Sequence, residues 1–379
     1  MHVWRRRSVD GGPRVGAFRG WRTPWPLAAN DGGLLKRVDA LLRRASGNVF
    51  TAAVARIEYR GENVFERAYG WTRGDRRRQP IFVDTRFDLA SLTKIFISTL
   101  ALAAVAQGDL PLDESLVPWF PQWRDTPRAA ITLRDLLAHD SGMHSGADYR
   151  VLLDRDIIEF TLERELAAPV RERVIYSDLG FITLGELLSR RAGTDLQTVL
   201  ARGADAVGRA TVAYRPHPRM WPAIPATEDD GWRGRVQGFV HDEKAYLLGG
   251  VAGHAGLFGS AAGVARLSQT YLAPLCGRVT LSGLPHQLIE AATSEQAPDA
   301  ILRRGLGWAL KTSDENSCGR HFSANTFGHT GFVGTCVWAD PKRDVLGVLL
   351  TNSVYFGRSD TRDLRAAFYE GLIEDLGLT

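Results

Sequence analysis

The segment 91–107, SLTKIFISTLALAAVAQ, is apolar on nearly every side. A helix without a polar face must be enclosed by other parts of the protein, and the Gly108 that follows it is typical of a helix C-cap. No uninterrupted apolar run of the chain approaches the roughly 18 residues of a membrane-spanning helix. We therefore predict a buried helix in the middle of a globular protein and no membrane span.

Strand patterns occupy both ends of the chain, and helical patterns fill its middle. Strands are predicted over 50–59, 63–69, 326–329, 334–339 and 345–351, with turns at 60–62 and 340–344. Periodic apolar residues predict helices over 34–45, 132–138, 179–191 and 361–376. This order predicts an α+β fold in which a central antiparallel sheet, formed from both chain ends, is flanked by helices and carries a mostly helical inserted domain.

The domain boundaries follow from the same patterns. Residues 1–32 show no helix or strand period and are expected to form an irregular N-terminal tail. The sheet domain is predicted over 33–120 and 290–379, and the inserted domain over 121–289. Arginines interrupt the tail where a signal peptide needs a continuous apolar stretch, so a cytoplasmic location is expected.

The composition argues against several classes of protein. The 379 residues are 44% hydrophobic and 24% charged, as in ordinary globular proteins. Three cysteines without a CxxC pair argue against a disulfide framework and a thiolate zinc site. The formal net charge is only +4, and the short basic clusters 5–7 and 76–78 are interpreted as solvent-exposed surface. No nucleic-acid partner is therefore expected.

Ser91 and Lys94 lie three residues apart at the start of the predicted central helix. This spacing brings an amine within reach of a hydroxyl, and the helix dipole favours negative charge on the serine. Burial beside Ile95, Phe96 and Ile97 is expected to lower the pKa of the Lys94 amine into the range of a general base. The alternative is a helix cap and a surface charge, the usual reason for this spacing. Lysine occurs only at positions 36, 94, 244, 311 and 342, which suggests that a lysine in an apolar setting performs chemistry that arginine cannot.

Two later segments offer groups that suit the same chemistry. In Tyr176-Ser177-Asp178, a phenol beside a cationic amine can accept the serine proton. In 329–332, His-Thr-Gly-Phe, a glycine at a strand end lets substrate approach the backbone, and the polar residues offer contacts. The alternatives are a packed aromatic residue before a helix and an ordinary strand end with a turn.

Taken together, the S-x-x-K, Y-x-D and H-T-G motifs resemble those of the serine β-lactamase and penicillin-binding-protein superfamily, and most closely its class C, D-alanyl-D-alanine carboxypeptidase and esterase branch. The segments 107–113 and 131–143 are similar to that family too, and the resemblance extends from about residue 34 to the C-terminus. It implies that Ser91 is the nucleophile, that Lys94 is its base or proton relay, and that Tyr176 activates the serine. It also implies an oxyanion hole formed by the N–H groups of Ser91 and Phe332.

Two residues depart from the family pattern. Asp178 stands where the family usually has asparagine, and its carboxylate can pair with Lys94 and keep it protonated, which would leave Tyr176 as the base. His329 stands where β-lactamases usually have lysine, so a fixed charge for a substrate carboxylate becomes one that titrates near neutrality. These changes favour an esterase or D,D-peptidase-like serine hydrolase, whose partner is a small ester, peptide or β-lactam substrate. The alternatives are a β-lactamase proper and a non-catalytic ligand-binding or regulatory protein on the same fold.

The sequence lacks HExxH, P-loop and GxSxG motifs, which argues against a zincin, an NTPase and an α/β-hydrolase. No cofactor or metal is expected. His139 and His241-Asp242 have no partner spacing for a metal and are interpreted as structural. His254, in a glycine-rich segment, is interpreted as holding loop backbone, with substrate contact as the alternative. The expected substrate-binding residues are Asp178, His329, Thr330, Gly331 and Phe332. The sequence gives no information on the oligomeric state.

Overall fold

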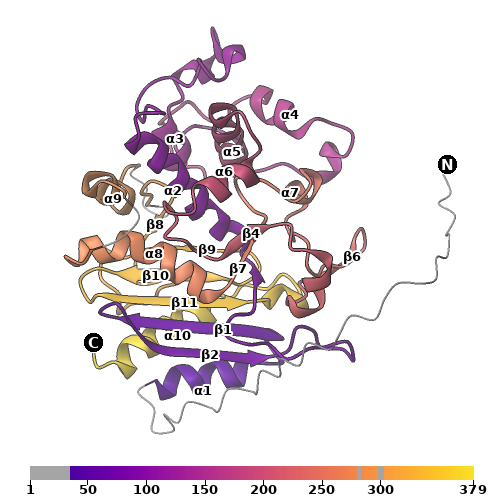
Figure 1. Ribbon diagram of the computed structural model, residues 1–379, viewed down its shortest axis with the longest axis vertical. Helices are drawn as coiled ribbons and strands as arrows, with labels where there is room; N and C mark the ends of the chain where they lie inside the picture. Colours follow the sequence, from indigo (N-terminus) through magenta and orange to yellow (C-terminus); the bar gives the residue numbers. More distant parts are fainter. Residues whose placement is uncertain (1–34, 280–282, 298–302) are drawn as a thin grey trace, which may run out of the picture. The chain divides into compact units, whose positions relative to one another are not determined.

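A six-stranded antiparallel sheet forms the centre of the protein (Figure 1). The structure, a computed structural model, describes residues 35–279, 283–297 and 303–379. The strand order is β2-β1-β11-β10-β9-β8, and the strands are β1 (Ala52–Tyr59), β2 (Glu62–Gly70), β8 (Ala309–Leu310), β9 (Phe327–Thr330), β10 (Cys336–Asp340) and β11 (Val345–Thr351). The first and last strands of this set pair directly, so the predicted sheet from both chain ends is confirmed.

Helices cover both faces of this sheet. On one face lie α1 (Lys36–Ala45) and α10 (Arg362–Asp375), and on the other lies α8 (Ala261–Leu275), as Figure 1 shows. Strand β1 alternates accordingly: Ala53 and Ala55 join the hydrophobic cluster of α1 and α10, and Val54 joins the cluster of α8. Such alternation follows from the two-residue period of a strand. All residues of β11 are buried, because the strand lies in the middle of a sheet covered on both sides.

The predicted central helix is α2 (Thr93–Ala106), and it is enclosed as its apolar sequence requires. A short 3-10 turn, Ala90–Leu92, precedes it. Ser91 therefore lies in a tight turn before the α-helix, not in the first α-helical turn. The remaining helices are α3 (Leu133–Leu137), α4 (Ile157–Glu163), α5 (Asp178–Ala192), α6 (Leu196–Arg202), α7 (Glu243–Leu247) and α9 (His286–Thr293).

Two small antiparallel sheets contain the remaining described strands. The strands β3 (Phe87–Asp88), β7 (Leu257–Gly259) and β4 (Val212–Tyr214) form one, and β5 (Asp229–Asp230) and β6 (Gly234–Arg235) form the other. Residues 35–379 make one compact unit, and the division into a sheet domain and an inserted domain stays a prediction. The predicted tail, 1–32, lies outside the described residues.

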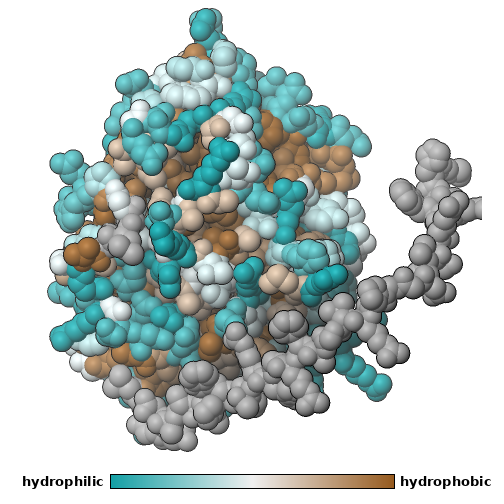
Figure 2. All heavy atoms as spheres, in the orientation of Figure 1, coloured by the Kyte–Doolittle hydropathy of each residue, from teal (hydrophilic) through white to brown (hydrophobic). Residues whose placement is uncertain are grey.

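The surface is mixed in character. Figure 2 shows polar and apolar residues interspersed over the face that it presents. Residues 76–78 are exposed, as the interpretation of this basic cluster as surface requires. Among the described helices, none combines the length and apolar character needed to cross a bilayer.

Candidate active site

A strained turn presents Ser91 at the start of α2. Ala90 has φ +45°, a left-handed conformation that costs an L-residue roughly 1–2 kcal/mol. The buried carboxylate of Asp88 stabilises the turn, because Oδ1 accepts from the Ala90 N–H at 2.8 Å and Oδ2 from the His241 N–H at 2.6 Å. The structure thus maintains an unfavourable backbone next to the candidate nucleophile, as is common at functional sites.

Lys94 lies directly beneath Ser91. Its side chain is fully buried, and Nζ donates to Ser91 Oγ at 3.1 Å. The same ammonium donates to Asp178 Oδ1 at 2.8 Å and to the backbone oxygen of His254 at 3.2 Å. The predicted pair of Ser91 and Lys94 is therefore brought together, and all the polar contacts of Lys94 point into one site.

The expected lowering of the Lys94 pKa is wrong. Burial by itself would lower it, but the charge of Asp178 and the contribution of Tyr176 outweigh burial and raise the pKa of the amine above its usual value. The Asp178 carboxyl responds in the same way: burial would raise its pKa, but Lys94, His254 and Lys244 together hold it below its usual value. The structure thus forms the ion pair between Asp178 and Lys94 that was considered as an alternative, and the raised pKa of Lys94 agrees with a protonated amine; the resulting role of Tyr176 as the base stays a prediction.

Tyr176 lies between several polar and charged groups. Its ring centroid is 4.7 Å from Lys94 Nζ and 5.2 Å from Arg304 Cζ, and the His139 ring packs against it at 4.7 Å. His139 Nδ1 also accepts from the Ser177 N–H at 3.0 Å, which fixes the backbone next to Tyr176. His139 thus has the structural role expected of it, and Tyr176 is positioned beside two cations.

The end of β9 packs directly against the turn of Ser91. A Cβ added at Gly331 would lie 2.8 Å from the Leu89 oxygen and 3.3 Å from Ala90 Cβ, so only glycine permits this approach. Thr335 Oγ1 donates to the Leu89 oxygen at 3.2 Å and binds the two segments together. The backbone of Phe332 follows immediately. Its N–H has no acceptor among the described residues, which leaves it free to bind an oxyanion.

His329 is neutral in the folded protein. It is buried, and Nδ1 lies 2.9 Å from the Thr330 oxygen, so Nδ1 donates and carries the proton. Burial, and then the charges of Arg304 and Lys94, place the pKa of His329 well below its usual value. The expected titration of His329 near neutrality, as a cation for a substrate carboxylate, is therefore wrong. Sequence reasoning missed it because the sequence around His329 does not reveal what covers the strand end.

Two buried histidines, His139 and His329, are expected to make the folded protein less stable in acid. His139 and His329 both have a pKa well below the usual value, mainly because of burial, so only the unfolded state binds protons as the pH falls below about 6.5. We expect the free energy of unfolding to fall by about 2 kcal/mol from pH 7 to 5.5, measured by urea denaturation. The variant His329→Gln retains one such histidine and should show about half of this decrease. Equal decreases in the two proteins would contradict this account.

A cleft of about 1020 Å³ opens beside these groups. Its wall includes Ser91, Tyr176 and the segment 329–332, so six of the eight predicted site residues line one cavity. Lys94 and Asp178 lie behind the wall. Among the described lining residues, the arginines at 303, 304, 358, 362 and 365 outnumber the acidic Glu315 and Asp360.

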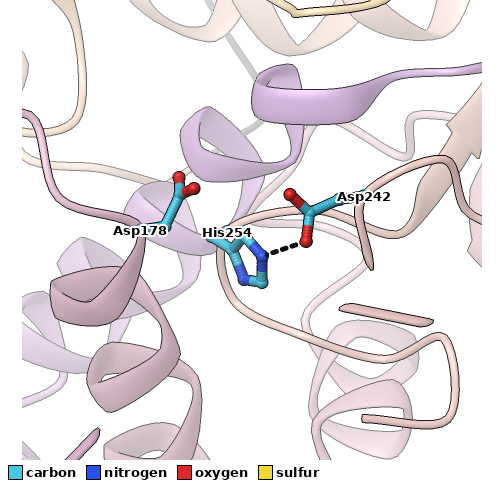
Figure 3. A group of neighbouring side chains, drawn as sticks. All are labelled: Asp178, Asp242 and His254. Atoms are coloured by element: carbon cyan, nitrogen blue, oxygen red, sulfur yellow. Dashed lines mark hydrogen bonds and ion pairs between the residues drawn. The ribbon is translucent and has the colours of Figure 1, made fainter. Parts of the chain in front are cut away.

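Three residues that the sequence had not assigned to the site, Lys244, Asp242 and His254, lie behind Lys94. Lys244 Nζ is 3.3 Å from Asp178 Oδ2 and 3.0 Å from Asp242 Oδ2, and Asp242 Oδ1 is 2.8 Å from His254 Nε2. Figure 3 shows the carboxylates of Asp178 and Asp242 on either side of the His254 ring. His254 therefore holds a carboxylate with its ring, in place of the loop backbone that was expected. The rarity of lysine in the sequence could have pointed to Lys244, because two of the five lysines of the chain, Lys94 and Lys244, contact the carboxylate of Asp178.

The carboxylates and His254 offer ligand atoms that lie within 4.8 Å of one another. From the spacing along the chain, Asp242 was expected to have no partner for a metal site, and the structure corrects this by placing Asp178 and His254 close to it. However, the Lys244 ammonium contacts both carboxylates and already supplies the positive charge that a metal ion would bring. The donor set therefore suits a network of ion pairs better than a metal centre.

The comparisons with known proteins agree with this geometry. The family model described as Beta-lactamase matches residues 38–371, a range that includes the whole candidate site. The chain belongs to the Beta-lactamase family. One curated relative of this Beta-lactamase-family chain is an N-acetylmuramyl-L-alanine amidase of Bacillus subtilis, which is 30% identical over 84% of this chain and 80% of the relative. Another is Esterase EstB of Burkholderia gladioli, which is 28% identical over 91% of this chain and 98% of the relative.

A solved structure confirms the fold of this Beta-lactamase-family chain. EstCE1, described as a hydrolase with promiscuous acyltransferase activity, aligns with a TM-score of 0.71 at 22% identity, over 89% of this chain and 98% of its own. The resemblance drawn from the three motifs is thus confirmed at the level of family and fold. The named relatives are hydrolases, an amidase and an esterase.

Proposed function

We propose that the chain is a serine hydrolase that forms an acyl intermediate on Ser91 and hydrolyses an ester or a D-amino-acid amide bond. The observation that carries this proposal is the 3.1 Å contact between Ser91 Oγ and Lys94 Nζ at the wall of a cleft. The relatives named as an esterase and an amidase support the same class of bond. A covalent intermediate divides one difficult step into two easier ones.

Tyr176 is the general base in this proposal, because Lys94 already holds its proton. The cations of Lys94 and Arg304 lie 4.7 and 5.2 Å from the ring centroid of Tyr176, close to the group that serves as the base in this proposal. The phenolate takes the Ser91 proton as Oγ attacks the carbonyl carbon, and Tyr176 then gives this proton to the departing alcohol or amine. In the second step Tyr176 takes a proton from water, whose oxygen attacks the acyl carbon; the bond from this carbon to Ser91 Oγ then breaks, Tyr176 gives the proton to Ser91 Oγ, and the acid is released.

The N–H groups of Ser91 and Phe332 form the oxyanion hole in this proposal. The close packing of Gly331 against Leu89 and Ala90 supports it, because this contact joins the two backbone segments that carry the donors. Donors of this kind are each worth roughly 3–4 kcal/mol of transition-state stabilisation. The Lys94 ammonium donates to Ser91 Oγ and stabilises the negative charge that develops there.

The arginines of the cleft favour a substrate with a negative charge. Arg303, Arg358 and Arg362 form ion pairs with carboxylates, whereas Arg365 donates to the Gly331 oxygen at 2.8 Å beside the proposed oxyanion hole and forms no ion pair with a carboxylate among the described residues. A positive charge without such a partner in a cleft attracts anions. Since arginine does not titrate at neutral pH, this attraction does not depend on His329.

A pH-independent preference for acidic substrates follows. Between pH 6 and 8 we expect the ratio of KM for an acidic ester to KM for its neutral analogue to stay constant within about twofold, because His329 is already neutral and the arginines stay charged. Steady-state kinetics on a matched pair of esters measures this ratio. A ratio that rises tenfold above pH 6.5 would assign the substrate carboxylate to a titrating histidine.

A substrate panel tests the proposed function. Purified protein is assayed with p-nitrophenyl esters, D-Ala-D-Ala peptides and nitrocefin, and Ser91→Ala is the control. We expect turnover of an ester or a D-peptide well above the Ser91→Ala background. Turnover of nitrocefin alone would identify a β-lactamase proper. Saturable binding of these compounds without turnover of any of them would identify a non-catalytic binding protein and refute the proposal.

A further inference from the structure

The contacts behind Ser91 close into a ring of five residues. Lys94 Nζ donates to Asp178, Asp178 pairs with Lys244, and Lys244 pairs with Asp242. The other Asp242 oxygen bonds to the His254 ring, and the His254 backbone oxygen accepts from Lys94 and completes the circuit. Four of the five side chains are charged, and none of them is exposed.

The ring divides the Asp178 carboxylate between two ammonium groups. Oδ1 lies 2.8 Å from Lys94 Nζ and Oδ2 lies 3.3 Å from Lys244 Nζ. Lys244 is in turn held by Asp242, whose Oδ1 also accepts from the Ala245 N–H at 2.8 Å at the start of α7. The carboxylate of Asp178 is therefore fixed from the side opposite Lys94. A buried ammonium that was fixed by only one partner would be free to turn away from Ser91.

We propose that Lys244 and the Asp242–His254 pair are positioning residues, which hold the Asp178 carboxylate in place, keep Lys94 directed at Ser91 and set how easily Lys94 loses its proton. This inference rests on the proposed function of Ser91 and Lys94, and deepens it by naming the groups that set their charge. None of the three residues lines the cleft. They act through Asp178 and Lys94, not on the substrate.

The ring fixes how easily the Lys94–Tyr176 pair loses a proton, because buried charges a few ångströms away shift such equilibria by roughly one to three pH units. The titratable and charged groups that surround Lys94 are Tyr176 and Asp178 from the start of α5, Asp242 and Lys244 from the start of α7, His254 before β7, His139 after α3, His329 on β9 and Arg304 before β8. Removing one positive or one negative member of the ring therefore has opposite consequences.

The test compares Lys244→Met with Asp242→Asn. Loss of the Lys244 cation makes proton loss from the Lys94–Tyr176 pair harder, so the ascending limb of the profile of kcat/KM against pH should shift to higher pH by about one unit. Loss of the Asp242 anion makes this proton loss easier, so the limb should shift to lower pH by a similar amount. The double variant Lys244→Met/Asp242→Asn restores the balance of charge and should return the limb to within about 0.3 unit of wild type. Lys311→Met, which removes a buried lysine outside the ring, should leave the limb in place.

A second measurement reads the charge of Lys94 without turnover. With only five lysines in the chain, NMR of protein carrying 15N-labelled lysine can resolve each Nζ, and the lysine variants assign the signals. We expect Lys94 to stay an ammonium to higher pH in Lys244→Met and to lose its proton at lower pH in Asp242→Asn. Shifts in the same direction in both variants, or in neither, would overturn the inference even if the enzyme is active. Opposite NMR shifts in a protein without Ser91-dependent turnover would instead support the ring and refute the proposed function.

Discussion

Replacing Lys94 by methionine is expected to lower kcat/KM by about 10³-fold while Ser91 stays in place. The variant loses the ammonium that donates to Ser91 Oγ at 3.1 Å and lies 4.7 Å from the ring centroid of Tyr176, and electrostatic contributions of this kind are worth two to four orders of magnitude in rate. Steady-state ester hydrolysis measures the loss. Retention of more than a tenth of the activity would exclude Lys94 from the chemistry.

The same variant should also be less stable, by about 2 kcal/mol in urea denaturation. Removing one partner of a buried ion pair leaves an uncompensated charge, which costs roughly 3–5 kcal/mol, but Lys244 still contacts Asp178 and reduces this cost. Lys342→Met is the matched control, because Lys342 is exposed in the turn after β10. The control should leave both activity and stability unchanged.

Replacing Tyr176 by phenylalanine is expected to lower kcat by roughly 10²- to 10⁴-fold, the range for loss of a general base. The ring stays, so its packing against His139 is retained, and stability should change by less than about 0.5 kcal/mol. The measurement is kcat and KM for a p-nitrophenyl ester across the pH range. The ascending limb of the wild-type profile should disappear in the variant. An active variant with an unchanged profile would assign the base to another group.

The sequence predicted those parts of the fold and site that local patterns determine. The apolar residues 91–107 required an enclosed helix, and α2 is enclosed. The strand patterns at the two chain ends required a common sheet, and β1 pairs with β11. The spacing of Ser91 and Lys94 predicted their contact, because three residues at the start of a helix fix the distance between two side chains.

What the sequence could not predict depends on residues far apart in the chain. The charge of Lys94 is decided by Asp178, 84 positions away, and not by the apolar neighbours that suggested a neutral amine. His329 is neutral because of what covers it, which no local pattern records. Gly331 was expected to make room for substrate, and the structure uses its missing side chain to pack against Leu89 and Ala90. In each case tertiary contacts changed the chemical state or the role of a residue that was correctly placed in the site.

The most direct test of the account is mass spectrometry of the protein after reaction with a fluorophosphonate or a penicillin. The Ser91–Lys94 contact predicts one covalent adduct per chain, located on the peptide that carries Ser91, and no adduct in Ser91→Ala. An adduct on a different residue, labelling that persists in Ser91→Ala, or a wild-type protein that both probes leave unmodified would contradict Ser91 as the nucleophile.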